Sequence, residues 1–212
     1  MEKIRNPINT YQEVVMRRKT VALALILFLM VPFYVYAGPP LEAVKSQINK
    51  ILDVLRDPSL KGEAGKKVKR EKIRGVSENM FDYAELSRRT LGQNWNKLNA
   101  AQQKEFMGLY KKLLEDAYAD KIITYTDEKV VFSKDSSLTE KTAEVQTTIM
   151  TKKADIPINY RVILKGSEWK VYDVVIEGVS LVSNYRNQFS EILASKSPDG
   201  LIDTLRKKVA KS

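Results

Sequence analysis

The chain has 212 residues, a length typical of a single domain, and its 36 lysine and arginine residues outnumber 26 acidic residues, for a net charge of +10. It contains no cysteine and no histidine. Disulfides, thiolate nucleophiles, thiolate zinc sites and an acylated cysteine anchor are therefore excluded, and the commonest acid–base group and metal ligand are missing. We expect no enzyme activity, no metal and no cofactor.

Residues 17–37 have the pattern of a secretory signal peptide. A basic start, Arg17-Arg18-Lys19, precedes an apolar run from Val21 to Val31, and the segment ends in a small-residue exit at Ala37. We expect cleavage after Ala37. The alternative is a retained membrane anchor, which is disfavoured because Pro32 interrupts the far end of the apolar segment.

Cleavage would define the domain plan and the charge of the exported chain. Residues 1–37 are then an N-terminal extension with a cleavable signal peptide, and 38–212 form one domain, with translation starting at Met1 or Met16. Cleavage removes five basic and two acidic residues, which leaves a net charge of +7. An exported basic protein meets anionic lipid and acidic protein surfaces, so we expect no nucleic-acid partner.

The first two predicted helices differ in character. Apolar residues at helical spacing predict a helix over 41–55, which ends at Asp57-Pro58. The segment 63–79 is strongly basic and contains Lys66, Lys67, Lys69, Arg70, Lys72 and Arg74. These residues form either a solvated helix face or a docking surface for a membrane or an acidic partner. For the second case, the docking candidates are Lys66, Lys67, Lys69 and Arg70.

Two further helices precede the strands. Residues 80–91 are predicted to be helical up to Gly92, which can adopt the backbone conformation of a helix end. Asn99 and Gln102 form a capping box that opens the longest helix. One stripe of that helix is apolar and consists of Phe106, Leu109, Tyr110, Leu113, Leu114, Ala117 and Tyr118.

After residue 127 the apolar period changes from that of a helix to that of a strand. We expect a first strand around residues 130–132 and three more over 143–149, 158–164 and 169–176.

Two loops predict the pairing of these strands. The two-residue loop Gly166-Ser167 pairs Val162 with Val171 and Tyr160 with Asp173. The four-residue link 152–155 sets Val145 beside Val162, and Ile149 beside Ile158.

One face of the predicted sheet is apolar and has to be covered by helices. It collects Ala143, Val145, Thr147, Ile149, Ile158, Tyr160, Val162, Leu164, Trp169 and Val171. Ala143 and Thr147 are small for a filled core, and Asp173 points to the same face unless a bulge shifts it. Either helices approach closely there and Asp173 bonds to a helix amide or to Arg186, or the face leaves an open space.

The segment 169–189 joins the last predicted strand to a helix that we expect to cover the sheet. Gly178 allows a sharp turn, Ser180 can cap the helix, and apolar residues recur at helical spacing from Leu181. Ser197-Pro198 then opens a last helix.

These residues resemble the MlaC family of periplasmic lipid-binding proteins, also called the toluene-tolerance auxiliary family. The resemblance is carried by Tyr172-Asp173-Val174-Val175-Ile176-Glu177-Gly178-Val179-Ser180-Leu181, followed by Tyr185-Arg186 and Phe189. Upstream matches are Phe81-Asp82-Tyr83, Leu91-Gly92, Trp95, Gln102-Gln103, Phe106 and the segment 113–118. They span most of the chain after residue 40.

The resemblance implies an α+β fold, with an antiparallel sheet of about four strands that has one face covered by several helices and encloses a hydrophobic lipid cavity. It implies a soluble, monomeric periplasmic carrier that shuttles phospholipid between the outer membrane and an inner-membrane ABC transporter, and so maintains outer-membrane lipid asymmetry. The implied partners are the transporter complex with its substrate-binding subunit and an outer-membrane complex of lipoprotein and porin. The phospholipid is cargo, not a cofactor.

The lipid-binding residues implied in this way combine the apolar sheet face with inward-facing positions on other elements. They are Phe81, Tyr110, Leu113, Tyr118, Val145, Thr147, Ile149, Tyr160, Val162, Leu164, Val174, Ile176, Val179, Val182 and Tyr185.

Three alternatives stand beside the phospholipid carrier. The first is a carrier of hopanoid or another isoprenoid lipid, because apolar walls discriminate poorly between hydrocarbon shapes. The second is a non-catalytic envelope adaptor with an ordinary core. The third is a hydrolase that uses paired carboxylates such as Asp82 and Glu85, which is disfavoured because no nucleophile or set of metal ligands accompanies them.

Overall fold

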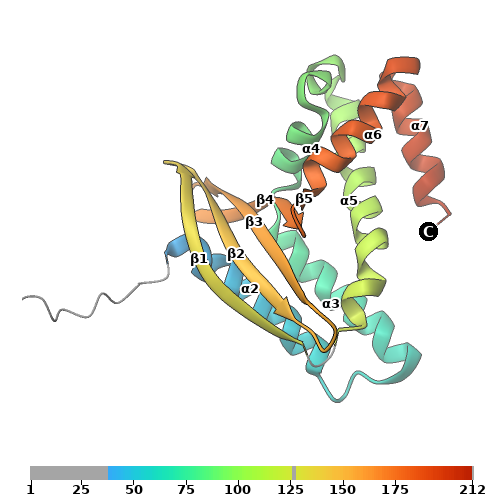
Figure 1. The fold of residues 1–212 in the computed structure, drawn as a ribbon. Coiled ribbons are helices and arrows are strands. Elements are labelled where there is room, and N and C mark those ends of the chain that lie inside the picture. Colours follow the sequence, from blue (N-terminus) through green and yellow to red (C-terminus); the bar gives the residue numbers. More distant parts are fainter. Residues whose placement is uncertain (1–37, 126–127, 212) are drawn as a thin grey trace, which may run out of the picture. The chain divides into compact units, whose positions relative to one another are not determined.

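A computed structural model of the protein describes residues 38–125 and 128–211 (Figure 1). The predicted N-terminal extension and signal peptide, residues 1–37, lie outside the described residues. The helices are α2 (Pro39–Arg56), α3 (Gly62–Met80), α4 (Tyr83–Leu91), the 3₁₀ helix η1 (Gly92–Lys97), α5 (Ala100–Ile123), α6 (Leu181–Ser195) and α7 (Pro198–Val209). The strands are β1 (Lys129–Thr139), β2 (Thr142–Met150), β3 (Asp155–Lys165), β4 (Glu168–Ile176) and β5 (Val179–Ser180).

The residues predicted to begin or end helices do so in the structure, with one exception. Asn99 and Gln102 form both bonds of a capping box at the start of α5, and Gly92 ends α4 with φ of 54°. The helix predicted over 80–91 begins too early. The carboxylate of Asp82 accepts a hydrogen bond from the amide of Glu85 and so starts α4 at Tyr83, while the chain just before it pairs with the edge of β4.

The strands form one antiparallel sheet in the order β1-β2-β3-β4-β5, which confirms the predicted α+β class. The predicted number of about four strands is one too few, because β5 adds a two-residue pairing to β4 and makes five. Glu177 and Gly178, between these strands, have φ of 49° and 83°. Two consecutive positive φ values are those of a type I′ hairpin turn, so Gly178 turns the chain back onto β4.

A bulge at Tyr172 changes the predicted register of β4. Val162 pairs with Val171 as expected, but Arg161 then pairs with Asp173. The predicted pair of Tyr160 with Asp173 is wrong, because the extra residue moves the Asp173 side chain to the opposite face of the sheet.

The pairing of β2 with β3 also differs from the prediction, by two residues. Val145 lies opposite Tyr160, and Ile149 lies opposite Ile156, because Met150 pairs with Asp155 and the four-residue link is 151–154, one residue earlier than predicted. A shift of two residues leaves every side chain on its predicted face, since side chains alternate with a period of two.

The buried carboxylate of Asp173 joins the sheet to α6. One of its oxygens accepts from the amide of Val182 at 3.0 Å, and the other accepts from the hydroxyl of Ser180 at 2.6 Å and from Arg161 at 3.3 Å. Ser180 in turn caps the helix by accepting from the amide of Ser183. Asp173 therefore bonds to a helix amide, as one alternative predicted, with Arg161 in the place expected for Arg186.

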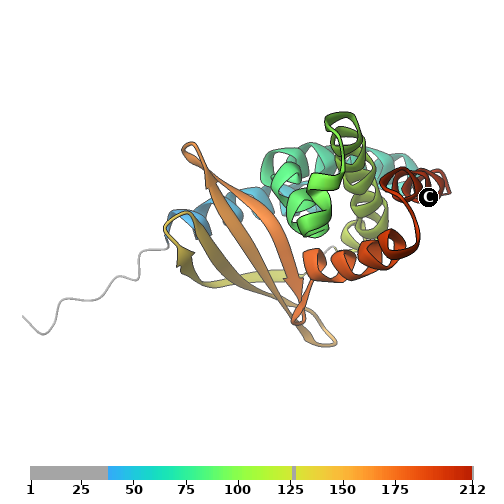
Figure 2. The ribbon, with the colours of Figure 1, turned by 90° about the horizontal axis from the view of Figure 1, so that it is seen from above.

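The core is divided into two clusters. The sheet cluster lies between α2 and one face of the sheet, and it includes Leu41, Val44 and Ile48 of α2. The helical cluster lies among α4, α5, α6 and α7 beside the sheet (Figures 1 and 2). The expectation that the helix after Gly178 covers the apolar face is wrong, because α6 contributes its buried side chains to the helical cluster and α2 covers the face instead.

Replacing Asp173 by asparagine should lower the free energy of unfolding by about 2–4 kcal/mol, because an amide cannot supply charged acceptors to the amide, hydroxyl and guanidinium groups around it. Urea unfolding measures the loss. The matched control is Asp53→Asn, at an exposed position on α2, which should change stability by less than about 0.5 kcal/mol. Equal losses in the two variants would contradict the structural role of Asp173.

Two glycine-to-alanine substitutions should change stability in opposite directions. Gly178→Ala should destabilise the fold by about 1–2 kcal/mol, because an L side chain is strained at positive φ. Gly108→Ala should stabilise it by about 1 kcal/mol, because a Cβ on α5 at that position meets open space and alanine favours helix. Thermal unfolding of both variants tests this, and shifts of the same sign would contradict it.

Candidate functional site

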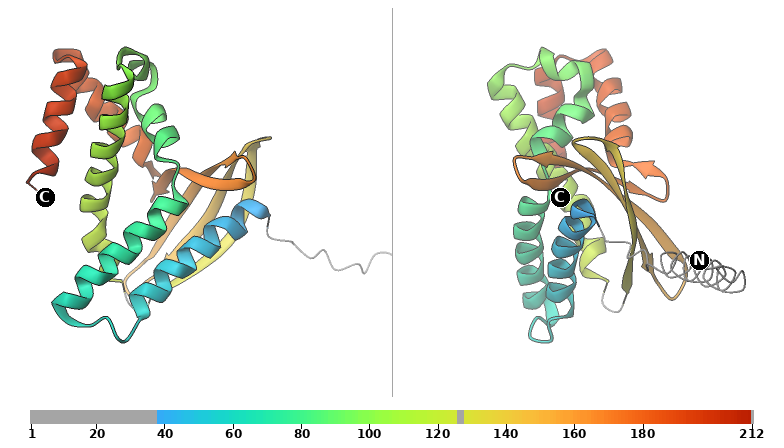
Figure 3. Two further views of the ribbon diagram at one scale, coloured as in Figure 1. Left: turned by 180° about the vertical axis from the view of Figure 1, so that it is seen from behind. Right: turned by 90° about the vertical axis from the view of Figure 1, so that its left-hand side faces the viewer.

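Helix α2 covers only part of the apolar sheet face. Four long strands span about 19 Å across a sheet, whereas one helix with its side chains is about 10–12 Å wide. Helix α2 lies along this face and contacts β1, β2 and β4 (Figure 3). The face is therefore wider than the helix that packs on it.

The apolar side chains around the sheet cluster reflect this partial cover, because they are half-buried. They come from β1, β3, β4 and α2, from the C-terminal cap of α3 and from the start of α6, and we call them the wall residues. They are Leu52, Phe81, Val130, Phe132, Ile158, Tyr160, Trp169, Ile176 and Leu181. Such side chains pack against a core on one side and leave apolar surface accessible on the other. A broad accessible apolar surface of this kind is typical of a binding site for an apolar molecule.

Tyr160 shows the character of this surface most clearly. Burial raises the pKa of its phenol, so its surroundings disfavour charge. The side chain is nevertheless half-buried, and its hydroxyl has no hydrogen-bond partner in the described part of the chain. A phenol that is surrounded by protein but not sealed in fits the wall of an open apolar site.

The predicted lipid-binding residues divide between the two clusters. Val145, Val162 and Val174 form the buried base of the sheet cluster, and Phe81, Tyr160 and Ile176 are wall residues. Tyr110, Leu113, Val182 and Tyr185 belong instead to the helical cluster, at 0–7% exposure.

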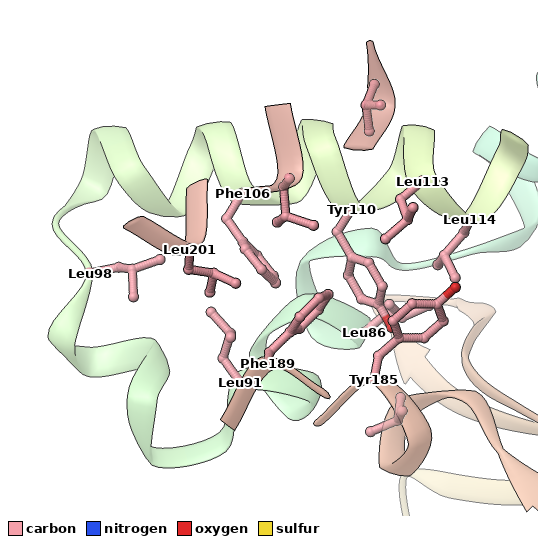
Figure 4. Close-up of a cluster of buried hydrophobic side chains, with 13 residues drawn as sticks. Leu86, Leu91, Leu98, Phe106, Tyr110, Leu113, Leu114, Tyr185, Phe189 and Leu201 are labelled. Carbon is pink, nitrogen blue, oxygen red and sulfur yellow. The ribbon is translucent and has the colours of Figure 1, made fainter. Parts of the chain in front are cut away.

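The helical cluster is a filled core (Figure 4). The rings of Phe106, Tyr110, Tyr185 and Phe189 contact one another, with centroids 5.2–5.7 Å apart, and several pairs meet edge to face. The hydroxyl of Tyr110 accepts from Thr90 at 3.3 Å. These aromatic residues fill their own space, so their contribution in this structure is packing.

Four of the predicted lipid-binding residues are not among the buried residues of either cluster. Tyr118 is half-buried and packs against the helical cluster, and burial raises the pKa of its phenol. Ile149 and Leu164 are half-buried and belong to neither cluster. Val179 is 58% exposed, because β5 pairs only with the end of β4 and its side chain is left largely open to solvent.

The two small residues of the sheet face are explained by packing. Ala143 is 1% exposed in the sheet cluster, where a small side chain lets α2 approach. The hydroxyl of Thr147 donates to the carbonyl of Ile158 at 2.8 Å, which satisfies a polar group that is 2% exposed. Both positions are closed to solvent at the base of the sheet.

The four docking candidates differ in what they contact. Lys69 donates to a backbone carbonyl of α2, and Arg70 forms an ion pair with Asp120 of α5. Lys66 pairs within its own helix. Lys67 is exposed and has no ion-pair partner among the described residues. Two of the four therefore hold α3 against its neighbours.

We also searched the described part of the chain for metal sites, membrane-spanning helices and pockets. It contains no group of three or more acidic residues placed to hold a metal ion, and no helix there is both long and apolar enough to cross a membrane. Two pockets lie away from the wall residues. One, of about 460 Å³, lies between α2 and α3, and the other, of about 280 Å³, lies beside the start of α6.

Several wall residues are absent from the predicted lipid-binding set, including Leu52, Val130, Phe132 and Leu181. The alternation of Val130 and Phe132 in β1 was a usable signal, because two apolar residues at a spacing of two share one face. Leu52 and Leu181 carried no such signal, since their position depends on how α2 and α6 meet the sheet.

Comparison with known proteins gives consistent matches. The profile of the family described as MlaC protein matches residues 45–207. The chain is 25% identical over 139 residues to the intermembrane phospholipid transport system binding protein MlaC of Haemophilus influenzae, a match that covers 62% of this chain and 65% of the relative. The chain thus spans slightly less than two thirds of that relative.

A solved structure has a similar fold. It is the phospholipid-binding protein of Ralstonia solanacearum in complex with a phospholipid, with a TM-score of 0.73 and 22% sequence identity. The match covers 82% of this chain and 98% of that protein. At this identity, the likeness shows a shared fold.

Substitution of a wall residue should weaken the binding of an apolar fluorescent probe to the native protein. Val130→Asn places a polar amide on the wall, and we expect probe affinity to fall at least about threefold, since each buried CH₂ contributes about 0.8 kcal/mol. Val68→Asn is the matched control, because Val68 is 42% exposed on α3. Fluorescence titration checks both, and an equal loss in the two variants would show that the probe binds elsewhere.

Proposed function

This chain belongs to the MlaC protein family, and from that membership we propose that it is a phospholipid carrier whose wall residues contact the acyl chains. The observation that carries the proposal is the partial cover of the apolar sheet face by α2, which leaves nine half-buried apolar side chains around the sheet cluster. The names of the H. influenzae relative and the R. solanacearum structure, which refer to phospholipid transport and phospholipid binding, support it.

The energetics of such a site favour the hydrocarbon part of the lipid. Each buried CH₂ group contributes about 0.8 kcal/mol, so an acyl chain of ordinary length supplies several kcal/mol without any bond to the headgroup. The wall residues offer almost no hydrogen-bonding groups, apart from the Tyr160 hydroxyl and the Trp169 indole. We therefore expect affinity to depend on chain length, with the headgroup left in water.

The cellular role follows from the same proposal. The carrier is exported after removal of residues 1–37, is a monomer in the periplasm, and moves phospholipid between the outer membrane and an inner-membrane ABC transporter, which maintains the lipid asymmetry of the outer membrane. Its partners are the substrate-binding subunit of the transporter and an outer-membrane lipoprotein and porin complex. The protein acts without catalysis and without a cofactor, and Lys66 and Lys67 are the docking candidates on α3 whose charges are not used between helices.

Mass spectrometry of lipids extracted from protein purified without detergent tests the carrier. We expect phospholipid in the native protein and a loss of most of it in Ile176→Asp, which places a charge on the wall. Met150→Asp is the matched control, because alternation along β2 places Met150 on the opposite face of the sheet, where it is 44% exposed. Urea unfolding confirms that both variants are folded.

The outcomes separate the alternatives. Native protein that is free of lipid and takes up no added phospholipid would overturn the proposal and leave the adaptor. An isoprenoid lipid in place of phospholipid would identify a different cargo for the same wall. Equal lipid content in the two aspartate variants would place the lipid elsewhere in the protein.

A further inference from the structure

The pocket beside the start of α6 lies on the opposite face of the sheet from the wall residues. Its volume is about 280 Å³, and three arginines line it together with Tyr172 and Ser183. The arginines are Arg89 of α4, Arg161 of β3 and Arg186 of α6. Arg161 pairs across the sheet with Glu144 and Asp173, and these residues alternate with Val145, Val162 and Val174 of the sheet cluster. The pocket and the wall are therefore separated by the sheet itself.

Each of the three guanidinium groups is held in place by the protein. Arg89 donates through Nε to the carboxylate of Glu85, on its own helix, at 2.7 Å. Its guanidinium carbon lies 4.0 Å from the ring centre of Tyr172. Arg186 donates through Nε and one terminal nitrogen to the backbone carbonyl of Arg89, with the shorter bond at 2.6 Å. Arg161 bonds through Nε to Glu144 and through Nη1 to Asp173.

These anchors leave hydrogen-bond donors unused around the pocket. Among the described residues, both terminal nitrogens of Arg89, Nη1 of Arg186 and Nη2 of Arg161 have no acceptor. Two carboxylates also line the pocket, and both are already bonded. Asp173 is 2% exposed and both of its oxygens accept hydrogen bonds, while the two oxygens of Glu144 accept from Asn159 at 3.2 Å and from Arg161 at 3.1 Å. Three arginines against two bonded carboxylates leave the lining with a net positive charge, and its unused polar atoms are guanidinium donors.

The arrangement of the donors selects the kind of anion. A planar carboxylate is bound best by two parallel donors of a single guanidinium. Here the unused donors come from three arginines on three different elements, with the Ser183 hydroxyl on the α6 side. Donors from several directions match a tetrahedral oxyanion, which offers oxygens in several directions. Because the arginines are already fixed, binding such an anion costs little side-chain entropy.

We propose that this pocket binds a phosphate-type oxyanion, as carried by inorganic phosphate or by the headgroup of a phospholipid. The pocket is too small for acyl chains and too polar to favour them, so it is distinct from the proposed lipid wall. The site is independent of the carrier function, since none of its residues is a wall residue.

Ser183→Asp tests the site without removing any arginine. The new carboxylate would stand in the pocket, while aspartate near the N-terminus of α6 favours the helix, so the fold is kept. The matched control is Asn184→Asp, which adds the same charge at the next position, outside the pocket. Isothermal titration calorimetry at low salt, with inorganic phosphate and separately with glycerophosphoglycerol, measures affinity in both variants and in the native protein.

We expect the native protein and Asn184→Asp to bind, and Ser183→Asp to bind about tenfold more weakly, because a carboxylate at contact distance from the anion repels it. Arg186→Lys, which keeps the charge but loses the forked donors, should weaken binding as well. Binding of both probes supports a general oxyanion site, and binding of glycerophosphoglycerol alone supports a headgroup site. No binding of either probe, or equal binding to the two aspartate variants, overturns the proposal. Lipid content by mass spectrometry should be unchanged in Ser183→Asp, so the outcome is separate from that of the carrier.

Discussion

The bonds of the Asp173 carboxylate hold the sheet and the helical cluster together. The bulge at Tyr172 turns this side chain away from the apolar face. On the opposite face it meets the first turn of α6, the Ser180 cap and Arg161. The β4–β5 turn at Gly178 returns the chain so that α6 begins directly beside β4. The C-terminal residues of the family resemblance are thus accounted for physically. Residues 172–181 build the junction between strand and helix, and Tyr185 and Phe189 continue from it into the helical cluster.

This junction allows the two clusters to have different properties. The helical cluster is packed with contacting aromatic rings, and a core of this density resists changes in volume. The sheet cluster is covered mainly by α2, with Met80 of α3 at one end, and is bordered by half-buried side chains. The proposed carrier function requires both properties, because a rigid part keeps the fold intact while an incompletely covered face exchanges an apolar ligand. The proposed oxyanion pocket uses the remaining surface, on the far side of the same strands.

The positive charge of the protein is a poor guide to its binding surfaces. Several cations of the basic segment on α3 are used inside the domain, where Arg70 and Arg74 pair with acidic residues of α5 and Lys72 lies 3.7 Å from Asp57. Exposed pairs of this kind contribute little stability individually, but together they set the position of α3. In contrast, the arginines around the proposed oxyanion pocket are far apart in the sequence. They lie close together because of strand pairing and the approach of α4 and α6.

The sequence by itself determined the elements of this protein, because helix caps, apolar periods and turn residues are local signals. The Asn99 capping box, the Ser180 and Ser197 caps and the Gly166-Ser167 hairpin all formed as predicted, and so did the apolar face of the sheet. Tertiary structure decided the bulge at Tyr172, the assignment of Tyr110 and Tyr185 to a filled core, and the choice of α2 over α6 as the cover. An amphipathic helix shows which of its faces is buried but not what it is buried against, since that depends on which distant surfaces meet.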